Sequence, residues 1–120
     1  MLGYLAGIGK KKRAAQQDVW KDLRALAYFG LGDCDRLLSH PDPAIENYQR
    51  ALTFDQEDPL IHWGLGLAFA RKAELTGNPA TLPTAREHFQ TMLTLNANIA
   101  QADQAKKYIA RIDAVLANKR

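Results

Sequence analysis

A seven-residue pattern occurs twice in this chain of 120 residues, and it constrains the fold more than any other feature. Residues 26–32 (LAYFGLG) align with residues 60–66 (LIHWGLG) at a constant offset of 34 residues. Four of the seven positions are identical, and two of the others pair one aromatic ring with another. Self-similarity at a period of about 20–50 residues is typical of chains built from stacked repeat units. We therefore predict that the chain contains two such units.

A second duplication follows the first and indicates where the two units differ. Residues 44–52 (AIENYQRAL) align with residues 85–93 (AREHFQTML), now at an offset of 41. The seven extra residues must lie between Gly66 and Ala85. The segment 76–83 (TGNPATLP) is rich in glycine, proline and asparagine, so we predict a loop there.

The duplicated segments have the apolar spacing of helices. Residues 60–75 are apolar around much of a helix, and residues 43–54 are apolar at steps of three and four residues. Residues 99–117 indicate a last helix. Asp42-Pro43 and Asp58-Pro59 are typical helix starts, and Gly77 is a typical helix end.

Glycines stand at matching positions inside the two first helices, where each costs up to about 1 kcal/mol relative to alanine. We expect Gly32 and Gly66 to allow close contact with a neighbouring helix, through small residues such as Ala44 and Ala51.

These residues resemble the tetratricopeptide (TPR) pattern of helix–turn–helix units. Leu65-Gly66 and Phe69 match the pattern of the first helix, and Ala44, Tyr48 and Ala51 match that of the second. The resemblance implies an all-α, right-handed stack of antiparallel helical hairpins. We expect a tail at 1–13 and one domain at 14–120, with repeat units at about 25–58 and 59–98 and a cap helix at about 99–117.

Members of this family bind other proteins, so the resemblance implies a protein–protein interaction module, either adaptor or scaffold, with a partner peptide or helix in a concave groove. The groove residues that it implies include Leu26, Phe29, Asp33, Arg36, Leu60, Trp63, Leu67 and Arg71, together with Leu37 and Ala70. The large rings Phe29 and Trp63 are the expected anchors. The alternative is a structural repeat protein that self-assembles into a homo-oligomer and whose groove is filled. Residues 1–24 or the last helix would then fill the groove.

Residue spacing gives no support to catalysis or to a metal or cofactor site. The histidines His40, His62 and His88 are far apart in sequence, and Cys34 has no second cysteine to pair with. No glycine-rich phosphate loop with its lysine is present. We therefore predict that the protein is not an enzyme and has no catalytic residues, metal ion or cofactor.

Charge is unevenly distributed, with two basic ends around an acidic middle. Residues 1–24 carry six basic and two acidic side chains, whereas residues 25–60 carry two basic and seven acidic ones. The basic ends leave nucleic acid or an anionic membrane as an alternative partner, which the acidic middle disfavours. Peripheral membrane contact would go through Lys10–Arg13. A single cysteine favours a cytoplasmic location, with a membrane-associated fragment of a longer protein as the alternative.

Overall fold

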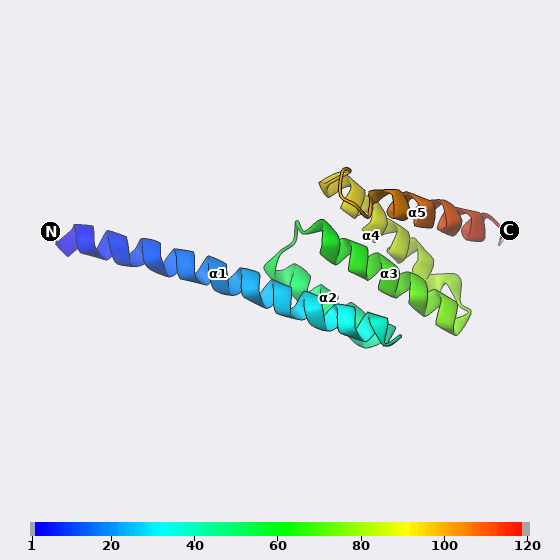
Figure 1. Ribbon diagram of the computed structural model, residues 1–120, viewed down its shortest axis with the longest axis horizontal. Helices are drawn as coiled ribbons and strands as arrows, with labels where there is room; N and C mark the ends of the chain where they lie inside the picture. The colour runs from blue at the N-terminus through cyan, green and yellow to red at the C-terminus, as the bar shows by residue number, and fades with distance from the viewer. Residues whose placement is uncertain (1, 119–120) are drawn as a thin grey trace.

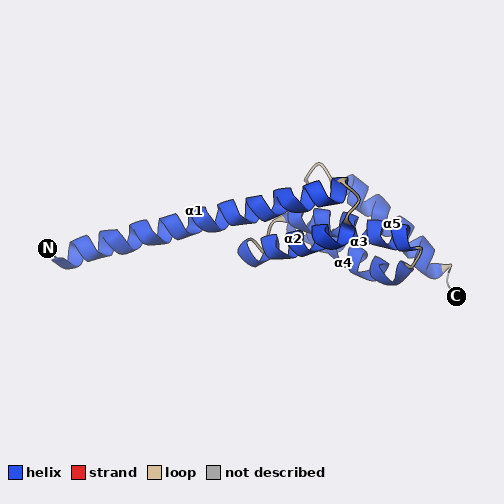
Figure 2. Ribbon diagram, turned by 90° about the horizontal axis from the view of Figure 1, so that it is seen from below, coloured by secondary structure: helices blue, strands red, loops and turns tan. Residues whose placement is uncertain are grey.

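The computed structural model describes the backbone of residues 2–118 and the side chains from residue 18 onward. It consists of α1 (Leu2–Leu37), α2 (Pro41–Phe54), α3 (Pro59–Thr76), the short 3₁₀ helix η1 (Pro79–Thr81), α4 (Leu82–Leu95) and α5 (Ala102–Ala117). Residues 2–118 contain no strand, so the predicted all-α class is confirmed (Figure 2).

The helices form two successive hairpins and a final helix (Figure 1). α1 packs on α2, α3 packs on α4, and α5 packs on α4. The N-terminal half of α1 projects beyond this body, so the molecule measures 72 × 27 × 23 Å. A helix of 36 residues is about 54 Å long at a rise of about 1.5 Å per residue, which accounts for most of the long dimension.

The expected tail and domain meet inside this helix, since α1 is continuous through residue 13. The side chains of Lys10–Arg13 lie outside the described ones, so the expected membrane contact stays a prediction. No described helix is both long enough and apolar enough to cross a bilayer.

Several helix ends lie where the sequence predicts them. The Asp58 carboxylate accepts a hydrogen bond of 2.9 Å from the Leu60 N–H, which caps the start of α3. Gly77 ends α3 in the left-handed conformation, with φ 65°, where a Cβ would be strained. The segment predicted as a loop ends α3, contains η1 and begins α4.

Two predicted starts are wrong by part of a turn. α2 begins at Pro41 rather than Pro43, and His40 precedes it without a side-chain cap. Asp42 therefore lies in the first turn, where its negative charge still interacts favourably with the helix dipole. The last helix begins at Ala102 instead of residue 99, because residues 96–101 form turns in which the Asn96 side chain accepts from the Asn98 N–H at 3.0 Å.

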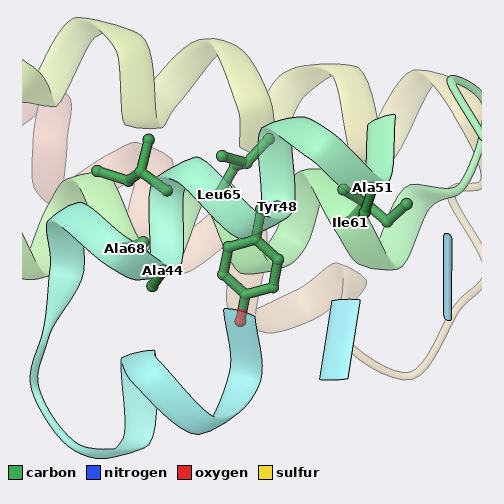
Figure 3. Close-up of a cluster of buried hydrophobic side chains, with 7 residues drawn as sticks. Ala44, Tyr48, Ala51, Ile61, Leu65 and Ala68 are labelled. Atoms are coloured by element: carbon green, nitrogen blue, oxygen red, sulfur yellow. The ribbon is translucent and has the colours of Figure 1, made fainter. Parts of the chain in front are cut away.

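The interior consists of two apolar clusters on either side of α3. The first is built around fully buried Tyr48, Ile61 and Leu65, with Ala44, Ala51 and Ala68 filling the space between them (Figure 3). The second lies between α3, α4 and α5 and is built around Phe89, Met92 and Ile112. α3 contributes side chains to the first cluster from one face and packs half-buried Trp63 and Leu67 against the second.

The glycines of the repeat are in close contact as predicted, but with aromatic rings and not with small residues. A Cβ on Gly32 would lie 2.7 Å from the Tyr48 ring, and one on Gly64 would lie 2.5 Å from the same ring. A Cβ on Gly66 would lie 2.5 Å from the ring of Phe89. The expectation named the small residues Ala44 and Ala51, whereas the nearest atoms belong to aromatic rings. The ring of Tyr48 in α2 lies on Gly32 of α1 and Gly64 of α3, and the ring of Phe89 in α4 lies on Gly66 of α3.

Candidate peptide-binding groove

A pocket of about 270 Å³ opens between the end of α1, the middle of α3 and α5. Its walls combine apolar side chains, two arginines and one glutamate, namely Arg36, Leu37, Leu67, Ala70, Arg71, Glu74 and Tyr108. The structure thus brings together Arg36, Leu67 and Arg71, three of the predicted groove residues, although they come from two different helices. Leu37 and Ala70 of the wider predicted set also line this pocket.

Asp33 and Arg36 have a structural partner that the sequence did not reveal. The buried Tyr48 hydroxyl donates a hydrogen bond of 2.5 Å to the Asp33 carboxylate and accepts one of 3.0 Å from Arg36 Nε. Arg36 and Asp33 also form an ion pair at 3.7 Å. Burial, together with the hydrogen bond to Asp33, raises the pKa of Tyr48 far above its ordinary range. Both charged residues are therefore held in place, and of the two Arg36 lines the pocket.

Arg71 is oriented by its neighbours on the opposite wall. Its guanidinium forms an ion pair of 2.8 Å with Glu74 one turn later. A long hydrogen bond of 3.4 Å joins it to the Ser39 hydroxyl in the turn after α1. The bond to Ser39 connects α3 with the turn after α1, and part of Arg71 stays accessible, because its side chain keeps 39% of its surface in solvent.

Trp63, one of the two expected anchors, lies against the last helix. Its ring is 5.5 Å from that of Phe89 and 5.9 Å from that of Tyr108 of α5. Such centroid distances are typical of packed aromatic pairs. Trp63 therefore belongs to the second apolar cluster, and Tyr108 supplies the aromatic surface of the pocket.

The remaining predicted residues lie outside the pocket. Phe29 is half-buried and its ring packs 6.0 Å from that of Tyr48. Leu60, at the start of α3, is also half-buried, whereas Leu26 is 64% exposed on α1. Leu26 and Leu37 are three turns apart along one side of α1, with the charged Asp33 between them.

Two histidines that are distant in sequence meet between α3 and α4. The Nδ1 atoms of His62 and His88 are 3.0 Å apart, and the ring of Phe69 stacks on His88 at 5.7 Å. Burial and the neighbouring His62 lower the pKa of His88, against a smaller opposite effect of Glu87. Among the residues whose side chains are described, no group of three or more potential ligands is arranged to hold a metal ion.

The comparisons with known proteins concern the segment that links the two hairpins. Residues 42–72 match the family model of the TPR repeat. The TPR match covers α2 and most of α3, the two helices whose side chains build the first apolar cluster around Tyr48. The comparison with curated proteins and the comparison with solved structures gave no match.

Sequence reasoning missed Glu74 and Tyr108 on the pocket wall, the hydroxyl contacts of Tyr48 and, outside the pocket, the His62–His88 pair. A signal existed for Tyr108, because it lies on the apolar face of the predicted last helix. No spacing rule would have found the histidine pair, since its two members are 26 positions apart on separate helices.

Proposed function

We propose that this protein is an interaction module, an adaptor or scaffold of the cytoplasm, that binds an apolar peptide segment of another protein. The TPR repeat supports this proposal, because repeats of this family are protein-binding modules. The observation that carries it is the pocket in which Leu37, Leu67 and Tyr108 form an apolar floor beside Arg36 and Arg71.

The chemistry of the pocket suits a short helical or extended segment. Leu37 is 75% exposed, so a partner that covers it gains apolar burial that the chain itself does not supply. Arg36 and Arg71 are already oriented by Tyr48 and Glu74, so they offer hydrogen bonds with little further loss of side-chain freedom. We expect apolar contacts to provide most of the affinity, with the arginines determining register and orientation.

The test is capture of partners from a cell lysate with the wild-type chain and with Leu37→Glu. Since Leu37 is largely exposed, the substitution is expected to leave the fold and its circular dichroism spectrum unchanged. It places a charge on the apolar floor, and we expect the partner to be lost. Leu75→Glu is the matched control, because Leu75 is 50% exposed on α3 and does not line the pocket.

A protein retained by wild type and by Leu75→Glu but lost by Leu37→Glu would support the groove as the binding site. Identical partners with all three chains would show that the groove is not the site. A variant at Trp63 is unsuitable for this purpose, because its ring packs in the second apolar cluster.

A further inference from the structure

The outer side of α1 carries a continuous apolar surface that the fold leaves uncovered. We define it as the outer stripe, consisting of Trp20, Leu23, Ala27, Gly30, Leu31, Cys34 and Leu38. All seven residues are exposed, including 59% of Trp20, 52% of Leu31 and 66% of Leu38. None of them carries a charge, although charged residues are frequent elsewhere on this helix.

The spacing places these residues on one side of the helix. Steps of three and four residues keep Trp20, Leu23, Ala27, Gly30 and Cys34 on one face over about four turns, roughly 21 Å of helix. This face adjoins the pocket at one end, because Leu37, which lines the pocket together with Arg36, follows Cys34 by one turn. Exposed apolar surfaces of this extent on soluble proteins usually mark interaction sites.

Among the glycines of the duplicated pattern, Gly30 is the one whose presence no contact of the described residues explains. The positions Gly32, Gly64 and Gly66 each accommodate an aromatic ring, whereas a Cβ on Gly30 would meet no atom within 4 Å. Glycine is the least favourable helix residue after proline. At the centre of the outer stripe, between the small residues Ala27 and Cys34, it would allow the backbone of another helix to approach closely.

We propose that the outer stripe is a homodimer interface, in which α1 of a second copy packs antiparallel on it. The stripe has small residues in its middle, at Ala27, Gly30 and Cys34, with Leu31 beside them, and larger side chains towards its ends, at Trp20, Leu23 and Leu38. In the proposed register Ala27 of one copy lies opposite Gly30 of the other, and Leu23 lies opposite Cys34. A closed two-fold contact of this kind is the commonest arrangement among oligomers.

Charge complementarity favours the antiparallel orientation. Arg24 and Asp35 flank the stripe on the same side, near its two ends. An antiparallel second helix brings Arg24 of each copy near Asp35 of the other, which gives two opposite-charge pairs in the dimer. Asp35 is held in place for this contact by a hydrogen bond of 2.8 Å from Asn47. A parallel pair would instead place the basic sequences 10–13 of both copies side by side.

The first test is the solution mass of the full chain as a function of concentration, measured by sedimentation or light scattering. The wild type is expected to rise towards twice its mass of 13.4 kDa. Gly30→Glu is expected to remain monomeric and fully helical, because its side chain points into open space in the monomer. Ala110→Glu, at an exposed position of α5, is the control and should dimerise like wild type.

The second test determines orientation with disulfides. In the proposed register the two Cys34 Cα atoms are about 16 Å apart along the axis, too far for the roughly 7 Å limit of a disulfide. Oxidised wild type should therefore stay free of covalent dimer. Leu23→Cys places a second thiol opposite Cys34 of the other copy, and oxidation should then give a covalent dimer.

The proposal is overturned if the wild type is monomeric at all concentrations, or if Gly30→Glu dimerises as the wild type does. A covalent Cys34 dimer of the wild type, or none from Leu23→Cys, would refute the antiparallel register. These outcomes are independent of the groove, because Leu37→Glu leaves the outer stripe intact and Gly30→Glu leaves the pocket intact.

Discussion

The surroundings of Gly30, Gly32, Gly64 and Gly66, inside α1 and α3, allow one substitution, glycine to alanine, to be compared in four environments. Helix propensity alone predicts the same effect at each position, a gain of about 1 kcal/mol in the free energy of unfolding. The structure predicts a gain only at Gly30 and a loss at the other three positions. At Gly30 the added methyl group meets no atom within 4 Å, so Gly30→Ala should stabilise the monomer by about 0.5–1 kcal/mol.

At Gly66 the same methyl group would lie 2.5 Å from Cε1 and 2.7 Å from Cδ1 of Phe89. Ordinary carbon contacts begin at about 3.5 Å, so the ring would have to move by about 1 Å. Phe89 is fully buried and its ring lies 5.1 Å from that of Tyr108, so the movement would disturb α5 as well. Overpacking of this kind costs about 1–3 kcal/mol. After the propensity gain we expect Gly66→Ala to lower the free energy of unfolding by about 1–2 kcal/mol.

Gly32→Ala and Gly64→Ala should behave like Gly66→Ala, because both would press on the fully buried ring of Tyr48. The assay is urea unfolding followed by circular dichroism, at a concentration low enough to keep every chain monomeric. The reasoning is refuted if all four variants shift the midpoint in the same direction. It is also refuted if Gly30→Ala is the most destabilised of the four.

Two further perturbations test the polar contacts. Tyr48→Phe removes the hydrogen bonds to Asp33 and Arg36 and should lower the free energy of unfolding by about 1–2 kcal/mol, measured by urea unfolding. The loss stays small because both partners are partly exposed and water can replace the hydroxyl. A loss above about 4 kcal/mol would contradict this explanation of the hydroxyl's contribution. Burial beside His62 lowers the pKa of His88, so the folded chain favours the neutral imidazole. The stability that depends on neutral His88 is fully present above the ordinary histidine pKa of about 6.5 and is lost as the pH falls below it. The free energy of unfolding should change by at most about 1.4 kcal/mol per pH unit. His88→Gln should flatten that part of the stability profile, and an unchanged profile would argue against the histidine pair as its origin.

Much of the fold could be predicted because the repeat fixes the spacing of its helices. The duplicated Leu-Gly pattern predicted α3, and Asp58 and Gly77 marked its ends by local chemistry that needs no tertiary information. The start of α2 was misplaced because Pro41 and Pro43 both satisfy the same local rule. Only packing and loop geometry can distinguish between two such signals.

The groove was less predictable than the fold, because its walls depend on how the last helix is placed. Arg36, Leu67 and Arg71, which the pattern assigned to a groove, line one pocket. The pattern could not show that Tyr108 would cover Trp63, since the contact joins positions 45 residues apart (63 and 108) on different helices. The pattern also could not show that the Tyr48 hydroxyl would bind Asp33. It predicts where an aromatic ring lies, but not which residue forms a hydrogen bond with its hydroxyl group.

The position of α3 between the two apolar clusters has a consequence for how the chain unfolds. Its residues Ile61 and Leu65 are buried in the first cluster, while its Gly66 supports Phe89 of the second. Neither hairpin can separate from the body without exposing one face of this helix to water. The amide protons of α2 and α4 should therefore exchange with solvent through a shared opening of the whole domain. In this chain two repeat units form a single cooperative unit because they have one central helix in common.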